Sequence, residues 1–514
     1  MNRWSALTLL LAVAGAVALR TPKLATRPLH NDEAVNAVKV SELWQHGRYV
    51  YDPDEYHGPS LHYATLPFLW LSGARTSDDL DDARLRLAPV VFGVGLILLL
   101  LLFSDGLSRQ AVGWAALFLA VSPAMVFYSR YFIHEMLLVF FTALTLGAGW
   151  RYTQTLSARW AVLAGAGAGL MFTTKETFVL SLAAMGLAGI ATVRWAMPKG
   201  ARVQSWLALW NWRHAALAGG AAFMIWLLLF SSFFTNFAGL ADSVRTYLPW
   251  FKRAGGHSPH LHPWSFYLQR LAWFHPTKGP VWSEGLILVL AAVGAVVSLA
   301  GKPSPLRRFL ALYTIILTAI YCAISYKTPW CLLSFHYGMI LLAGVGAAAL
   351  VGFFRASASR AGVVALVLAL TAQLAWQARR ASLVFPADRR NPYVYAQTVP
   401  DLLHLVQRAD GLARVAPAGY ETVVKIIAPE NDYWPLPWYL RRFKHLGWYG
   451  KLPEDPFAPV VMVSSKLDAQ LDTKSGKKWI MAELTELRPG NFFELYVELE
   501  LWKRYVETLP RDRD

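Results

Sequence analysis

The sequence predicts an all-α polytopic membrane protein with a small α/β domain at its C-terminal end. Of the 514 residues, 55% are hydrophobic and 16% are charged, whereas soluble chains carry about 25% charged residues. An aromatic content of 14% and only two cysteines exclude a disordered chain and a disulfide-stapled scaffold. Because the apolar residues concentrate before residue 380, we expect a transmembrane domain over residues 1–380 and an extracytoplasmic domain over residues 381–514.

About eleven stretches are apolar and nearly free of charge, as helices that span a bilayer must be. They lie at 4–19, 87–104, 111–128, 136–150, 160–173, 177–193, 214–235, 285–300, 309–325, 331–352 and 361–377. We expect the first stretch to be a retained helix. Its arginine, apolar run and small residues also fit the alternative of a cleaved signal peptide.

Basic residues in alternate connections predict the orientation in the membrane. Arg109, Arg151 and Arg194 stand in three of these short connections. Placing them in the cytoplasm puts the N-terminus there, and an odd number of crossings leaves the C-terminal domain outside the cytoplasmic (inner) membrane. The net charge of +16 comes partly from this bias. Since no discrete basic face is evident, nucleic acid is not a predicted partner.

The C-terminal residues have the composition of a folded domain. Runs rich in β-forming residues at 423–427, 460–464 and 492–501 predict strands, and the stretch 438–444 predicts a helix. Turns rich in Pro and Gly separate these runs. We therefore expect a small α/β or α+β domain.

The first candidate site is His30-Asn31-Asp32-Glu33, just after the first apolar stretch. Carboxylates close to a membrane interior are functional candidates, because their burial there is expensive. Asn31 is expected to cap a helix beginning at Asp32, which places both acids at the positive end of the helix dipole. The alternative is structural, because acidic residues are common in a first helical turn.

The second candidate site is the segment 128–135, between the third and fourth apolar stretches. The connection is so short that Glu135 must lie at the outer membrane boundary. Its place beside His134, at the start of an apolar helix, favours a functional role. A structural ion pair between Glu135 and Arg130 is the alternative.

These two sites together resemble those of the GT-C membrane glycosyltransferases, which include protein O-mannosyltransferases and the aminoarabinose transferases that modify lipid A. The resemblance rests on Asp32-Glu33 after the first span and an acidic residue after a Ser-Arg-Tyr segment before the fourth. Residues 30–63, 122–140 and 325–336 are most similar to a prokaryotic mannosyltransferase-like branch associated with flippase activity. The resemblance covers the chain to residue 380 and implies a GT-C-like fold.

The resemblance also implies an activity: transfer of a sugar from a polyprenyl-phosphate donor in the bilayer to a hydroxyl of a protein, lipid or glycan acceptor. It assigns the catalytic carboxylate to Asp32 and the second acidic position to Glu135, where some relatives have Asp. A glycosyl phosphate has a good leaving group, so the reaction needs a base for the acceptor hydroxyl and cations for the developing phosphate charge. We expect Arg130, Lys327 and Arg270 to supply those cations. For Lys327 the alternative is a helix-end lysine whose side chain reaches toward the membrane interface without binding substrate.

Further residues are predicted to contact the substrates. Glu33 and His134 adjoin the two acidic positions, and Tyr56 and His57 stand in a Pro/Gly turn, for which a purely structural role is the alternative. Lys175 and Glu176 are expected to form a structural pair with each other, and contact with lipid phosphate is the alternative. His257, His260 and His262 have a spacing at which a divalent metal is possible. The alternative for them is an aromatic and histidine-rich loop at the membrane interface, and no other cofactor is expected.

Two other functions remain as alternatives. A transporter or flippase component for lipid-linked sugars would lack transfer chemistry. Transporters place charges near the bilayer midplane, whereas here the carboxylates gather at one face. A membrane scaffold whose tail binds a partner is the third possibility, and in that case the acidic sites would be incidental.

Overall fold

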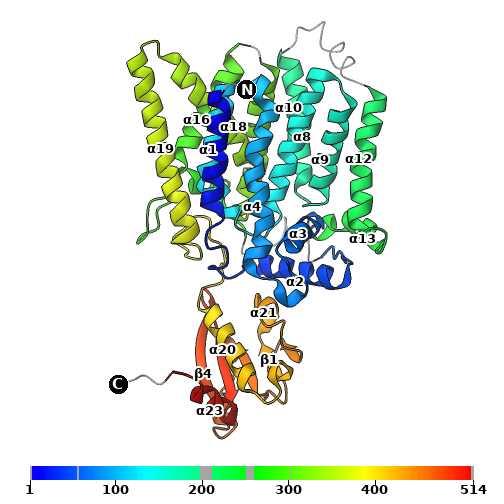
Figure 1. The fold of residues 1–514 in the computed structure, drawn as a ribbon, viewed down its shortest axis with the longest axis vertical. Helices are drawn as coiled ribbons and strands as arrows, with labels where there is room; N and C mark the ends of the chain where they lie inside the picture. The colour runs from blue at the N-terminus through cyan, green and yellow to red at the C-terminus, as the bar shows by residue number, and fades with distance from the viewer. Residues whose placement is uncertain (1–2, 55–56, 197–210, 251–259, 303, 511–514) are drawn as a thin grey trace.

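The computed structural model describes residues 3–54, 57–196, 211–250, 260–302 and 304–510 and shows a helical bundle that carries a small sheet domain at one end (Figure 1). Each predicted apolar stretch corresponds to a helix. These helices are α1 (Arg3–Arg20), α4 (Asp82–Leu99), α6 (Arg109–Val121), α8 (Glu135–Thr155), α9 (Ala158–Phe172), α10 (Phe178–Ala196), α12 (Trp212–Phe230), α16 (Gly285–Ala300), α17 (Pro305–Ala323), α18 (Leu333–Phe353) and α19 (Ser357–Leu383).

Six helical segments in the described residues are long and apolar enough to cross a membrane, and α1, α6, α9 and α16 are shorter apolar helices. The predicted polytopic membrane fold is confirmed, while the number of eleven crossings stays a prediction. The N-terminus and the sheet domain lie at opposite ends of the bundle (Figure 1). We call the end that carries the sheet domain the domain-side end.

Two helix boundaries differ from the prediction for physical reasons. The third apolar stretch is broken at Ser122, where α6 ends and the short helix α7 (Pro123–Tyr128) begins. A proline fits the first turn of a helix but has no N–H to continue one. The helix α4 begins at Asp82, five positions before the predicted span, and includes Arg86. This charge is tolerated because it is paired with Glu33.

The long connection between α1 and α4 is folded into two further helices, α2 (Asn31–His46) and α3 (Ser60–Leu71). They lie across the domain-side end of the bundle (Figure 1). The connection between α12 and α16 contains α13 (Ala238–Arg245) and α15 (Phe266–Ala272). These short helices give the domain-side end its structure, and the candidate site is built from them.

The C-terminal domain is a five-stranded mixed sheet in the order β2-β1-β3-β5-β4. The strands are β1 (Val424–Ile427), β2 (Leu446–Tyr449), β3 (Val460–Ser464), β4 (Trp479–Arg488) and β5 (Asn491–Glu498). β1 is parallel to β2 and β3, and β5 is antiparallel to β3 and β4. The helices α20 (Leu402–Val415) and α23 (Leu499–Glu507) pack on each other beside this sheet. The three predicted strands correspond to β1, β3 and β5.

The predicted helix at 438–444 is wrong. Only α21 (Leu436–Tyr439) forms, and the Arg441 side chain that follows it donates hydrogen bonds of 2.7 and 2.6 Å to the carbonyl oxygens of Trp438 and Leu80. Trp438 and Tyr439 donate hydrogen bonds of 2.9 and 2.7 Å to the buried carboxylate of Asp82 at the start of α4. The Tyr439 hydroxyl also accepts a 2.8 Å hydrogen bond from the backbone N–H of Leu29. The C-terminal domain therefore holds the segment that leads into α2.

Candidate active site

The helix α2 begins one residue earlier than predicted, and its cap is His30 rather than Asn31. The Nδ1 atom of His30 accepts a 3.1 Å hydrogen bond from the Asp32 N–H, and the Glu33 carboxylate accepts a 2.9 Å hydrogen bond from the His30 N–H. This reciprocal arrangement is a capping box with histidine in the place of serine or threonine. It turns Glu33 inward and leaves Asp32 facing out, so adjacent acids have different environments.

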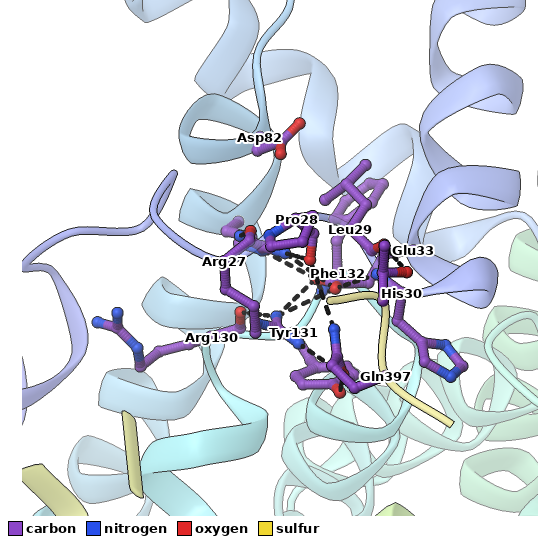
Figure 2. Close-up of polar contacts among 12 residues, drawn as sticks. Arg27, Pro28, Leu29, His30, Glu33, Asp82, Arg130, Tyr131, Phe132 and Gln397 are labelled. Atoms are coloured by element: carbon purple, nitrogen blue, oxygen red, sulfur yellow. Dashed lines mark hydrogen bonds and ion pairs between the residues drawn. The ribbon is translucent and has the colours of Figure 1, made fainter. Parts of the chain in front are cut away.

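Glu33 is fully buried at the centre of an ion-pair cluster (Figure 2). Its two carboxylate oxygens accept hydrogen bonds of 2.8 and 2.9 Å from Arg86, and Arg27 lies 3.0 Å away. The backbone N–H of Phe132 donates a further bond of 2.8 Å, which ties α2 to the segment before α8. Every lone pair of the carboxylate is therefore engaged by the protein, which gives Glu33 a role in holding this segment. Its contact with substrate stays a prediction.

The side chain of Asp32 is 51% exposed and borders a cavity of about 290 Å³ at the domain-side end. The cavity lies between α2, the connection from α9 to α10, and the turn between α17 and α18. Its polar and charged lining consists of Asp32, Asn36, His57, Lys175, Thr177 and Thr328. Its aromatic lining consists of Trp250, Tyr267, Tyr321, Tyr326 and Trp330. The exposed carboxylate of Asp32, whose Oδ1 atom lies 3.7 Å from His30 Nδ1, thus shares one cavity with a cation and several aromatic rings.

Glu135 is the first residue of α8, is buried, and forms an ion pair with Lys175 rather than with Arg130. Lys175 stands in the connection between α9 and α10 and lines the cavity. Burial alone would lower the pKa of Lys175, but the carboxylate of Glu135 raises it above its ordinary value. Lys175 therefore stays protonated, and it supplies the cation of the cavity, whereas the sequence analysis favoured a structural pair with Glu176.

Glu176 pairs with His57 and not with Lys175. The Nδ1 atom of His57 lies 2.7 Å from the Glu176 carboxylate, so the predicted Lys175–Glu176 pair is wrong. His134 is buried beside them, with its ring centroid 5.3 Å from that of His57 and its Nε2 atom 3.0 Å from the Gly58 carbonyl oxygen. Burial and the neighbouring His57 and His62 lower the pKa of His134 well below its ordinary value. His134 is thus a neutral packing residue behind the cavity, whereas His57 lines it.

Gly58 allows this arrangement because no side chain fits at its position. A Cβ atom there would lie 2.2 Å from the carbonyl oxygen of Thr173, which is fixed backbone. The Gly58 and Ser60 N–H groups donate hydrogen bonds of 3.1 and 2.9 Å to the carbonyl oxygens of Thr174 and Thr173. The turn after His57 is therefore anchored directly on the segment that presents Lys175.

We expect Gly58→Ala to destabilise the protein by about 1–3 kcal/mol, the usual effect of forced overpacking. The measurement is the thermal unfolding midpoint of the purified protein. Gly149→Ala in α8 is the matched control, because a Cβ atom there meets nothing within 4 Å. Equal midpoints for the two variants would show that the turn can move away from Thr173.

The three predicted phosphate-binding cations do not line this cavity. Arg130 donates to the carbonyl oxygens of Arg20 and Lys23 at 2.7 and 3.3 Å. In Figure 2 it points away from Glu33. Arg270 stacks on the Phe266 ring at 3.7 Å. Lys327 donates to the carbonyl oxygens of His262, at 3.2 Å, and of Ile324.

The histidine-rich connection before α16 is only partly covered by the structure. Tyr56 and His257 lie outside the described residues. His260 and His262 both contact the hydroxyl of Tyr395, at 2.7 and 3.2 Å. Among the described residues, no group of three His, Cys, Asp or Glu side chains is placed to hold a metal ion. The possible metal site therefore remains an expectation that depends on His257.

A second buried polar network lies at the domain-side end, and the sequence analysis did not predict it. Glu284, the N-cap residue of α16, accepts hydrogen bonds from Ser122 at 2.6 Å and Tyr393 at 2.7 Å, and lies 2.9 Å from His336 Nε2. The backbone N–H of Ala124 donates to the same carboxylate at 2.9 Å. The network joins α7, α16 and α18 at the domain-side end and holds these elements in register.

Comparisons with known proteins identify the fold of this chain. Residues 68–232 match the family described as dolichyl-phosphate-mannose-protein mannosyltransferase. No curated protein matches the chain by sequence. Among solved structures, ArnT from Cupriavidus metallidurans in the apo state has a TM-score of 0.61 at 14% identity, and the match covers 95% of this chain and 97% of that one.

ArnT bound to undecaprenyl phosphate has the same TM-score of 0.61 at 16% identity, with the same coverage of 95% and 97%. The archaeal oligosaccharyltransferase AglB from Archaeoglobus fulgidus, in complex with an inhibitory peptide and a dolichol-phosphate, has a TM-score of 0.59 at 13% identity. That match covers 98% of this chain and 77% of AglB. The chain therefore has the fold of the GT-C membrane glycosyltransferases, and the resemblance predicted from the sequence is confirmed at that level. The narrower flippase-associated branch stays a prediction.

Proposed function

We propose that this protein transfers a sugar from a polyprenyl-phosphate donor to an acceptor hydroxyl at the outer face of the cytoplasmic membrane. The observation that carries the proposal is the cavity in which the exposed carboxylate of Asp32 and the ammonium group of Lys175 face one space. The N-terminus would then lie in the cytoplasm and the C-terminal domain outside. The donor would reach the cavity from the bilayer and the acceptor from the aqueous side.

Asp32 is the general base of the proposed reaction. Its carboxylate takes the proton of the acceptor hydroxyl as that oxygen forms a bond to the anomeric carbon. The bond from this carbon to the phosphate oxygen breaks, and polyprenyl phosphate leaves with the electron pair. Phosphate is a good leaving group, so no separate acid is required. Among the described residues that line the cavity, Asp32 is the only carboxylate.

Lys175 is the cation that receives the developing phosphate charge. An ammonium group has three N–H donors, and one of them is directed at Glu135, which leaves two for phosphate oxygens. Glu135 is nearly inaccessible, so we assign it the positioning of Lys175 in place of the catalytic role expected from the sequence. The ion pair keeps Lys175 charged and fixes its direction before substrate arrives.

The relatives support the choice of donor. Solved proteins of this fold are described as bound to undecaprenyl phosphate or to a dolichol-phosphate, which are both polyprenyl-type lipid phosphates. The aromatic rings across the cavity from Asp32 offer faces on which a sugar ring can stack. We leave the acceptor as a hydroxyl of a protein, lipid or glycan.

Activity with a panel of polyprenyl-phosphate sugars tests the proposal, with purified full-length protein and a mixture of candidate acceptors. We expect release of polyprenyl phosphate coupled to glycosylation of an acceptor. A protein that moves the intact lipid-linked sugar between leaflets but releases no polyprenyl phosphate would be a transporter, and the proposal would then be wrong.

Lys175→Gln is expected to lower the turnover number by about 10²–10³-fold, the range measured when one stabilising donor is removed from a transition state. The matched control is Lys278→Gln, because Lys278 is exposed on the same end of the bundle and does not line the cavity. Glu135→Gln should reproduce part of the loss, since Lys175 would lose the partner that directs it. Unchanged turnover in Lys175→Gln would remove this residue from the phosphate site.

A further inference from the structure

A second pocket at the domain-side end is lined by four cationic side chains and lies apart from the cavity described above. It is bounded by the chain that follows α1, the start of α4, the end of α7 and the end of α19. Its lining consists of Lys23, Leu24, Thr26, Arg27, Arg86, Phe127, Arg130, Ser382, Leu383 and Pro386. No residue is shared with the cavity beside Asp32.

The positive charge around this pocket exceeds the negative charge that the protein supplies. Arg27 and Arg86 share the single carboxylate of Glu33. Arg130 donates only to carbonyl oxygens, and no carboxylate of the described residues lies within 4.0 Å of it or of Lys23. A buried cation without a counter-charge is costly, so this site favours an added anion.

The charged groups that act most strongly on Arg130 are two other arginines, and their positive charge is not balanced by a carboxylate bonded to Arg130. Burial, followed by repulsion from Arg27 and Arg86, lowers the pKa of Arg130 to about 9. The carboxylate of Asp82 accepts hydrogen bonds from Trp438 and Tyr439 of the C-terminal domain. An anion in the pocket would give Arg130 a counter-charge.

The size and the walls of the pocket define which anion fits. Its volume is about 50 Å³, whereas a single water needs about 10–15 Å³ on this measure, so a group of the size of phosphate can enter. Leu24, Phe127, Leu383 and Pro386 form an apolar wall beside the cations. The helix α19 stands at the rim of the bundle (Figure 1). Its exposed side chains include Leu366, Leu368, Leu370 and Trp376, so this wall adjoins the lipid-facing side.

We propose that this pocket binds the phosphate group of an anionic membrane lipid, with Arg130 and Lys23 as its principal donors. The lipid chains would lie along the apolar wall and α19, while the phosphate neutralises the excess of positive charge. Because Arg27 and Arg86 line the pocket and also hold Glu33, the bound lipid would stabilise the segment that carries Asp32. The proposal does not depend on the transferase reaction.

Thermal unfolding of the full-length protein in a neutral detergent tests this site. Dioctanoyl phosphatidic acid supplies the lipid phosphate, dioctanoyl glycerol is the same lipid without phosphate, and inorganic phosphate supplies the anion alone. We expect phosphatidic acid to raise the unfolding midpoint with a saturable dose dependence, and dioctanoyl glycerol not to raise it. An equal response to inorganic phosphate would confirm the phosphate site and identify the free anion as sufficient.

Four variants test whether phosphatidic acid binds in this pocket or elsewhere on the protein. Lys23→Gln and Arg130→Gln are each expected to weaken the apparent affinity for phosphatidic acid by about tenfold, through the loss of a charged donor. Lys23 is exposed, so its variant should fold normally. Arg389→Gln, at an exposed arginine of the same end, and Lys175→Gln, in the other cavity, should leave the affinity unchanged. An unchanged affinity in Lys23→Gln and Arg130→Gln, or no response of the unmodified protein, would overturn the proposal.

Discussion

Asp32→Asn is expected to lower the rate of sugar transfer by about 10²–10⁴-fold, the range attributed to a positioned general base. Asparagine has nearly the same shape but cannot accept the proton of the acceptor hydroxyl. The substitution should not disturb the fold, because the side chain of Asp32 is 51% exposed. The backbone N–H of this residue, which donates a hydrogen bond to His30 Nδ1, is retained. The measurement is polyprenyl phosphate release per mole of purified protein, with the unfolding midpoint recorded in parallel.

Asp78→Asn is the control for this prediction. Asp78 is an exposed acid of the same end of the bundle, and it lies outside the cavity. The control should transfer sugar at the normal rate. If Asp32→Asn also transfers at the normal rate, Asp32 is not the base. If its midpoint falls together with its activity, the loss is structural and Asp32 has no demonstrated chemical role.

The fold was predictable wherever composition alone decides the structure. A helix in a bilayer must be apolar over its length, and each predicted apolar stretch is a helix in the structure. Composition does not predict the bounds of a helix that contains a charged residue whose partner lies far away in the sequence. The helix α4 begins at Asp82 and carries Arg86 because Glu33, far away in sequence, balances that charge. The segment 438–444 likewise has the composition of a helix, but only Trp438 and Tyr439 are helical, and their side chains bind Asp82 at the start of α4.

The candidate site was predictable in part. The position of Asp32 after the first span located the free carboxylate of the cavity, whereas the role of its neighbour Glu33 depended on which way the capping box turned each acid. The partner of Glu135 could not be found from local sequence. Arg130 is only five residues away but turns toward the end of α1, while Lys175, forty residues away, reaches Glu135 through the packing of α8 against α9.

The different roles proposed for the neighbouring acids Asp32 and Glu33 follow from their different burial. Asp32 and Glu33 have similar chemistry, yet one is half exposed beside a cavity and the other is inaccessible between two arginines. In the proposed reaction, one of these adjacent acids takes part in the chemistry and the other supports the fold. The two functions should separate experimentally, because substitution of Asp32 should affect activity alone and substitution of Glu33 should affect stability first.

Glu33→Gln is expected to destabilise the protein by about 3–5 kcal/mol, the usual effect of breaking a buried ion pair from one side. The buried guanidinium groups of Arg27 and Arg86 would lose the one carboxylate of the described residues with which they form ion pairs. Burial alone would raise the pKa of Glu33, but the charges of Arg27 and Arg86 and their hydrogen bonds lower it from 4.5 to about 2. A lowered pKa means that the ionised carboxylate stabilises the fold above pH 4.5. This contribution is lost as the pH falls from 4.5 toward 2.

Thermal unfolding between pH 7 and pH 3 measures both effects. The unmodified protein should lose stability as the pH falls below 4.5, and Glu33→Gln should start less stable and lose less over the same range. Glu42→Gln is the matched control on α2, because Glu42 forms only a half-exposed pair with Lys39 at 2.8 Å. Such a pair contributes about 0–1 kcal/mol. If Glu33→Gln unfolds at the same midpoint as Glu42→Gln, the arginine cluster does not depend on the Glu33 charge, and another anion must balance it.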